Sequence, residues 1–123
     1  MSIYKLSAEK ITDKNKPTRH FSNKQEKSVA KAIGGKTTAN SGATPWQKGD
    51  ITSDKVLYEC KTCTKDQASF SIKKEWIEKN RQEMIFMDKD YSVIVFNFGP
   101  DQENYYILDE LTFQEFIEYL ENK

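Results

Sequence analysis

The chain has 123 residues, 37% of them hydrophobic and 31% charged, which is enough for one domain with a packed core and too few for two. It contains no apolar run long enough to cross a membrane and no charged-then-apolar leader, so we expect neither a membrane span nor secretion. Two cysteines are too few for a disulfide scaffold. An intracellular, cytoplasmic protein in a reducing environment is therefore the default expectation.

The net charge of zero conceals an uneven distribution. Residues 1–50 contain ten Lys/Arg and four Asp/Glu, whereas residues 88–123 contain two and nine. A basic first half favours a polyanionic partner that contacts one side of the molecule, although an ordinary solvated surface explains the same charges.

The first part of the chain predicts a basic arm followed by a helix. Residues 1–20 are polar and rich in lysine, so they predict a loosely held arm in front of a single domain over 21–123. Ser22 and Gln25 have the spacing of a capping box, and the helix that they begin is expected to end at Gly34-Gly35.

Glu26 lies on the apolar side of this expected helix. It precedes the three apolar positions by three, four and seven residues, which places it on their face. A carboxylate that points inward needs a partner. The apolar positions are Val29, Ala30 and Ile33.

The middle of the chain predicts strands and a second helix. Small and polar residues over 36–48 predict a strand end and a loop, and residues 56–61 predict a strand. A short strand near 69–72 and a helix over 73–87 follow. Alternation along the strand places three of its residues on one face: Leu57, Glu59 and Lys61.

The last third predicts a hairpin and a final helix. Residues 91–98 are nearly continuously apolar, as in a central strand covered on both faces, and residues 105–108 are expected to pair with them. Thr112 and Glu115 form a second capping box. The final helix is expected to bury Phe113, Phe116, Ile117 and Leu120. This order of elements predicts an α/β domain with a mixed central β-sheet flanked by helices.

Asp50, Glu59 and Lys61 form the pattern that best predicts chemistry. An aspartate at the start of one strand faces a Glu-x-Lys on a neighbouring strand, and the single intervening residue turns Glu59 and Lys61 the same way. Two carboxylates can hold Mg²⁺, and a nearby ammonium can orient water or stabilise charge on a phosphate. Glu26 can complete this acidic pocket directly or through a metal-bound water. Such a cluster suits phosphodiester hydrolysis.

These residues, taken with their neighbours, resemble the PD-(D/E)-x-K nuclease superfamily. The closest likeness is to the small Holliday junction resolvases of archaea and their phage-encoded relatives, and it covers residues 21–87. It rests on the segments Ser22-Asn23-Lys24-Gln25-Glu26, Ser41-Gly42-Ala43, Lys48-Gly49-Asp50, Glu59-Cys60-Lys61 and Ser69-Phe70-Ser71-Ile72-Lys73.

The resemblance implies a restriction-endonuclease-like fold and a metal-dependent DNA endonuclease. It implies that Asp50 and Glu59 bind Mg²⁺, for which Mn²⁺ can substitute, together with the Cys60 backbone carbonyl. Lys61 would assist the attacking water, Glu26 would be the helix acid, and Ser41 would lie in the loop that approaches DNA. Gly49 departs from the proline in the superfamily's name.

The expected partners are DNA and a second copy of the chain. A four-way junction is cut symmetrically on two strands, so one site per subunit implies a two-fold homodimer. Either the hairpin over 91–108 or the helix that contains Trp76 would supply its apolar interface. The residues expected to contact DNA are Arg19, His20, Lys24, Ser41, Lys48 and Lys73.

Other functions remain open from the sequence. The chain can be a nuclease for other branched or duplex DNA, a nicking enzyme, or a non-catalytic DNA-binding protein that kept the fold. Cys60-x-x-Cys63 suggests zinc or redox work, but zinc needs four ligands and redox pairs generally open a helix. We therefore assign Cys60 to the core and no role to Cys63.

Overall fold

Two strands rich in β-branched and apolar residues form the centre of the structure. They are β3 (Val56–Lys61) and β4 (Tyr91–Phe96), which pair in parallel over their full lengths. The computed structural model describes the backbone of residues 7–37 and 50–123 and the side chains of residues 20–36 and 51–123. Ser41 and Lys48 therefore lie outside the described residues.

Three shorter strands complete a mixed sheet in the order β1-β2-β3-β4-β5. β1 (Lys36–Thr37) and β2 (Asp50–Thr52) continue it antiparallel beyond β3, and β5 (Tyr105–Ile107) is antiparallel to β4. Three helices flank the sheet: α1 (Ser7–Ile33), α2 (Lys74–Phe86) and α3 (Glu110–Glu121). The α/β class predicted from the sequence is confirmed.

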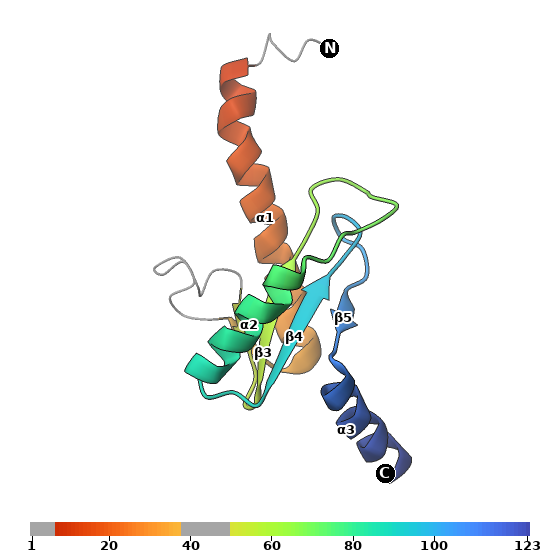
Figure 1. Cartoon of the computed structure of the whole chain (residues 1–123). Helices are drawn as coiled ribbons and strands as arrows, with labels where there is room; N and C mark the ends of the chain where they lie inside the picture. The colour runs from red at the N-terminus through yellow and green to blue at the C-terminus, as the bar shows by residue number, and fades with distance from the viewer. Residues whose placement is uncertain (1–6, 38–49) are drawn as a thin grey trace.

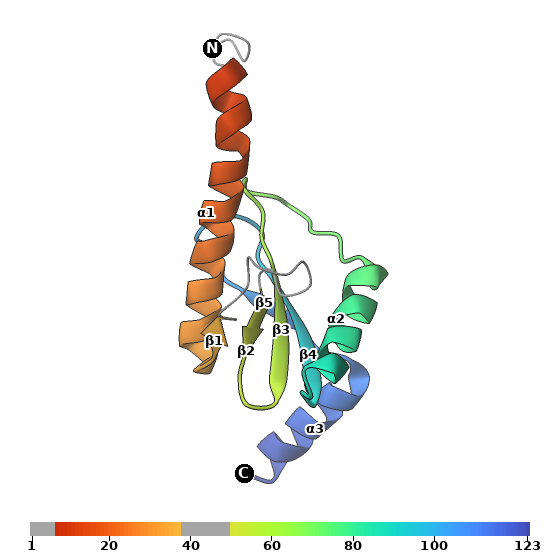
Figure 2. The same ribbon diagram turned by 90° about the vertical axis from the view of Figure 1, so that its left-hand side faces the viewer.

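The helices α1 and α2 lie on opposite faces of the sheet (Figure 2). On the first face, Val29 of α1 is fully buried in a cluster with residues of β2 and β4. On the second face, the Asn80 side chain of α2 donates a 3.2 Å hydrogen bond to the carbonyl of Val93. The main cluster consists of Val29, Ile51, Val93 and Val95.

The first helix is longer than its sequence predicts. It begins at Ser7, so it crosses the expected boundary at residue 21, and Ser22 lies inside it rather than capping it. Its N-terminal half projects beyond the sheet (Figure 1). Hydrophobic periodicity reveals only the part of a helix that packs against something, and the prediction therefore recovered only the packed half. No helix in the described part of the chain has the length and apolar character to span a membrane.

Two further local predictions are wrong. Residues 69–72 form no strand. The final helix is capped by Asp109, whose side chain accepts a 2.8 Å hydrogen bond from the Thr112 amide, so the expected Thr112–Glu115 capping box is replaced. Asp109 is an equally good N-cap residue located three positions earlier.

The final helix does not bury its apolar side. Four residues predicted to be core are 36% to 51% exposed: Phe113, Phe116, Ile117 and Leu120. The helix is held instead through its polar side. Arg81 of α2 lies 3.2 Å from the carboxylate of Asp109, and the neighbouring carboxylate of Glu115 raises the pKa of Tyr91 in β4.

Candidate functional site

The register of β2 and β3 brings two of the predicted acidic residues together. Asp50 is paired with Glu59 in the antiparallel ladder. Residues directly opposite one another in such a ladder share a face of the sheet, so position 50 lies on the Glu59 face. Alternation along β3 also confirms that Leu57, Glu59 and Lys61 share a face, with Leu57 fully buried beneath α2.

Lys61 is held by two groups at the end of β3. Its ammonium nitrogen lies 3.2 Å from a carboxylate oxygen of Glu59, and both side chains are largely buried. The same nitrogen lies 4.5 Å from the ring centroid of Trp76, a distance at which an ammonium is attracted to the ring face. The lysine is therefore fixed between a carboxylate and an aromatic ring.

Glu26 joins this pair from α1. It is only 9% exposed, and burial and the charge of Glu59 both raise the pKa of its carboxyl group. Because the Glu26 side chain is buried, the inward direction predicted for it is confirmed.

A hydrogen bond between α1 and β3 explains how α1 reaches the site. The side-chain amide of Gln25 in α1 donates a 2.6 Å hydrogen bond to the carbonyl of Lys61, the last residue of β3. The neighbouring residue, Glu26, is thereby held beside the end of β3.

The arrangement is chemically suited to a hard divalent cation. Two neighbouring carboxylates repel one another when both are ionised, and a cation between them removes that repulsion. Among the side chains that the structure describes, no three His, Cys, Asp or Glu residues form a ready metal site. Glu26 and Glu59 need a third oxygen ligand, and position 50 is the place in the register from which a carboxylate would supply it.

The other predicted residues are more dispersed. Arg19 lies in α1 with its side chain outside the described part, and His20 is exposed. Lys24 is bound to Asp101 on the surface at 2.8 Å. Lys73 is exposed directly before α2, and its ammonium lies 5.7 Å from the Trp76 ring centroid.

The two cysteines belong to different environments. Cys60 packs against the main hydrophobic cluster, on the face of β3 opposite Glu59, as predicted. The Cys63 thiol lies 3.8 Å from the carbonyl of Asn97 as a hydrogen-bond donor, and burial raises its pKa. A raised pKa keeps the thiol protonated and unreactive, so this contact favours a structural role. Coordination by the Cys60 backbone carbonyl stays a prediction.

Trp76 is the functional residue that the sequence analysis missed. Its helical spacing assigned it to the core, and that assignment accounts for its contact with Phe70. The signal for its second role was present in the strand: alternation turned Lys61 toward the face that the following helix covers. Combining the two patterns would have placed the ring beside the ammonium.

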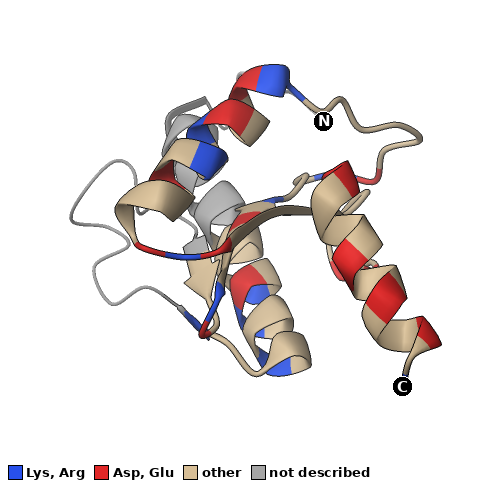
Figure 3. Ribbon diagram, turned by 60° about the horizontal axis from the view of Figure 1, so that its bottom comes forward, with Lys and Arg blue, Asp and Glu red and all other residues tan. Residues whose placement is uncertain are grey.

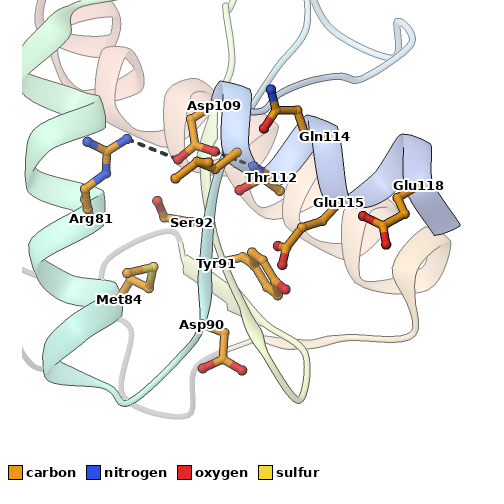
Figure 4. Close-up of a pocket in the computed structure, with 11 residues that line it drawn as sticks. Arg81, Met84, Asp90, Tyr91, Ser92, Asp109, Thr112, Gln114, Glu115 and Glu118 are labelled. Atoms are coloured by element: carbon orange, nitrogen blue, oxygen red, sulfur yellow. Dashed lines mark hydrogen bonds and ion pairs between the residues drawn. The ribbon is translucent and has the colours of Figure 1, made fainter.

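A pocket of about 450 Å³ lies elsewhere, between α2, β4 and α3 (Figure 4). Arg81, Tyr91, Asp109 and Glu115 line it together with other polar residues, and it includes none of the predicted site residues. It marks the loose junction between α3 and the body of the protein.

Comparisons of the chain with protein-family models, with curated proteins and with solved structures found no match. Relatives therefore contribute nothing to the assignment of function.

Proposed function

We propose that this protein is a divalent-metal-dependent DNA endonuclease with a restriction-endonuclease-like fold, and that its substrate is the four-way (Holliday) junction. The surroundings of Glu59 carry the proposal: Glu59 is ion-paired to Lys61 and stands opposite position 50, and its charge is one cause of the raised pKa of the buried Glu26. A chance Glu-x-Lys on a solvated strand face would not be buried with a second carboxylate.

Each residue has a definite role in this proposal. Asp50 and Glu59 hold Mg²⁺, with Mn²⁺ as a substitute, and Glu26 contributes directly or through a bound water. The cation, when bound, polarises the phosphate and lowers the pKa of water. Lys61 stabilises the negative charge that develops on the phosphate oxygens. Its contacts with Glu59 and Trp76 hold the ammonium close to that position before the substrate binds.

We propose a two-fold homodimer as the active form, because a junction is cut on two strands and one chain has one site. The apolar side of α3 supports this assembly better than either surface expected from the sequence. Phe113, Phe116, Ile117 and Leu120 form an exposed apolar seam, while Glu115 and Glu118 line the pocket beside β4. Two copies can therefore pair through this seam and cover its apolar side chains.

A substrate panel tests the proposal. Labelled four-way junctions, flaps, linear duplex and single strands are incubated with the protein in Mg²⁺, in Mn²⁺ and with a chelator. We expect paired symmetric nicks in the junction that require the metal. Preferred cutting of flaps or linear duplex would instead favour a repair or nicking nuclease, and inactivity on every substrate with both metals would favour a non-catalytic DNA-binding protein.

A further inference from the structure

A row of side chains crosses the sheet from the candidate site to its edge. In the ladder, Lys61 of β3 is paired with Phe96 of β4, and Phe96 is paired with Tyr105 of β5. Cross-strand partners share a face of the sheet, so Tyr105 lies on the same face as Lys61. Two strand spacings, about 10 Å, separate their backbones.

The aromatic rings in this row form a stack with one open end. Phe96 lies between Phe70 and Tyr105, with centroid distances of 4.9 Å and 5.6 Å and interplanar angles of 28° in both pairs. Phe98 contacts Tyr105 edge-on at 5.6 Å. β5 is the last strand of the described sheet, and Tyr105 is 44% exposed. The ring of Tyr105 thus ends the stack at the solvent.

Two ammonium groups lie at the other end of the row, and one of them, that of Lys61, is paired with Glu59. The ring centroids of Phe70 and Trp76 lie 6.2 Å apart, and the ammonium groups of Lys61 and Lys73 both lie near the Trp76 ring. A strand of DNA carries a phosphate and a base on every nucleotide, so it offers a partner to both ends of this surface. Aromatic rings beside lysines are a common platform for unpaired bases.

We propose that Tyr105 stacks against an unpaired base of the DNA strand whose phosphate lies at Lys61. This inference rests on the proposed nuclease function and deepens it by naming the residue that contacts a base and thereby selects the substrate. The bases of a linear duplex are already stacked on their neighbours, whereas bases at a branch point or in a single strand can be unstacked. Tyr105 therefore selects branched or single-stranded DNA over linear duplex.

Binding measurements without divalent metal test this proposal, because they do not depend on cleavage. Fluorescence anisotropy of a labelled single strand, four-way junction and linear duplex is compared between the wild type, Tyr105→Leu and Tyr105→Phe. We expect Tyr105→Leu to weaken binding of the single strand and the junction about tenfold and to leave the duplex nearly unchanged. Tyr105→Phe keeps the ring and is expected to bind like the wild type.

Tyr106→Leu is the matched control. Tyr106 is the next residue along β5, is also exposed, and contacts Tyr58 on the opposite face of the sheet. The proposal is wrong if Tyr105→Leu binds all three DNAs like the wild type, or if its affinity for the duplex falls as much as its affinity for the other two. It is also wrong if Tyr106→Leu loses as much affinity as Tyr105→Leu. In each case the ring stack is only a hydrophobic core. A wild type that fails to bind the single strand also overturns it.

Photocrosslinking provides a second measurement on the unaltered protein, in case Tyr105→Leu does not fold. A single strand that contains 5-iodouracil is irradiated with the wild type, and mass spectrometry identifies the attached residue. We expect Tyr105, and attachment only at other residues contradicts the proposal. Failure of the nuclease function is distinguishable from failure of this proposal. If the wild type crosslinks at Tyr105 but never cleaves DNA, the stacking surface is supported and the proposed nuclease activity is wrong.

Discussion

Lys61 is the residue whose surroundings the structure defines most completely. Glu59 neutralises its charge from one side, Trp76 covers it on another, and Gln25 binds its carbonyl. A lysine on an exposed strand would sample many rotamers, and holding it in one position costs entropy that must be offset by such contacts. Glu59 and Trp76 therefore hold the ammonium group of Lys61 in one position.

Replacing Trp76 tests whether its ring holds the ammonium group of Lys61 in place. We expect Trp76→Leu to lower kcat for junction cleavage by about tenfold, because a cation–π contact in a partly desolvated site contributes on the order of 1–2 kcal/mol. Trp76→Phe should recover most of the activity, since it keeps an aromatic face, and affinity for the junction should be unchanged. Thermal unfolding of the two variants is measured alongside, and their melting temperatures should be similar. A loss of kcat that appears only together with a large fall in melting temperature would show that Trp76 acts only through folding.

Glu26 makes stability depend on pH. Its pKa in the folded protein is raised above the ordinary value of 4.5, first by burial and then by Glu59. The folded state therefore keeps the proton to a higher pH than the unfolded state, and stability decreases as pH rises from 4.5 through the raised pKa. Glu26→Gln removes this titration.

Thermal unfolding of the wild type and Glu26→Gln, measured with a chelator from pH 4 to pH 8, checks the sign. We expect similar melting temperatures near pH 4 and a growing advantage for the variant toward pH 8. Mg²⁺ should reduce that advantage by stabilising only the wild type. Melting curves that stay parallel across the whole pH range would contradict the assignment of Glu26 to the acidic site.

Elements with a face packed against the body of the protein were the ones that the sequence predicted well. β3 was predicted with its observed bounds, and the hairpin of β4 and β5 and the helix α2 were predicted within two residues. Their apolar patterns have the period of the element because they are covered. The acidic pair was equally predictable, since alternation and strand order place Glu59 opposite position 50.

The two terminal helices could not be predicted in the same way. The first half of α1 projects from the body and needs no apolar stripe, so its sequence resembles an arm. α3 has a clear apolar stripe, which predicts burial, but that stripe faces away from the chain's own sheet. Periodicity shows that a face needs a partner and does not show which molecule supplies it.

The charge of the molecule is segregated at its ends. α3 carries four glutamates and no lysine or arginine, as its red bands show (Figure 3). Such a helix would repel DNA, so a DNA-binding protein gains by placing it away from the substrate. In the proposed homodimer, the apolar seam of this helix would pair with its copy at a side turned away from the DNA.

The mass of the protein in solution tests this arrangement. Light scattering should give about twice the chain mass of 14.3 kDa for the wild type and a monomer for the double variant Phe116→Asp, Leu120→Asp. Leu111→Asp is the control, because Leu111 is 73% exposed on the same helix but lines the pocket on its other side. A monomeric wild type, or a double variant that is still a dimer, would show that α3 does not form a dimer interface.

The proposed metal-dependent hydrolytic site consists of Glu59 and its neighbours. The most direct measurement compares Mg²⁺-dependent nicking of a labelled four-way junction by the wild type, Glu59→Gln, Asp50→Asn and Lys61→Ala, with junction binding measured alongside. Glu78→Gln, an exposed acid on α2, serves as the control. We predict that the three site variants bind the junction and do not cut it, while the control cuts it normally. Cleavage by Glu59→Gln at the wild-type rate would contradict the account.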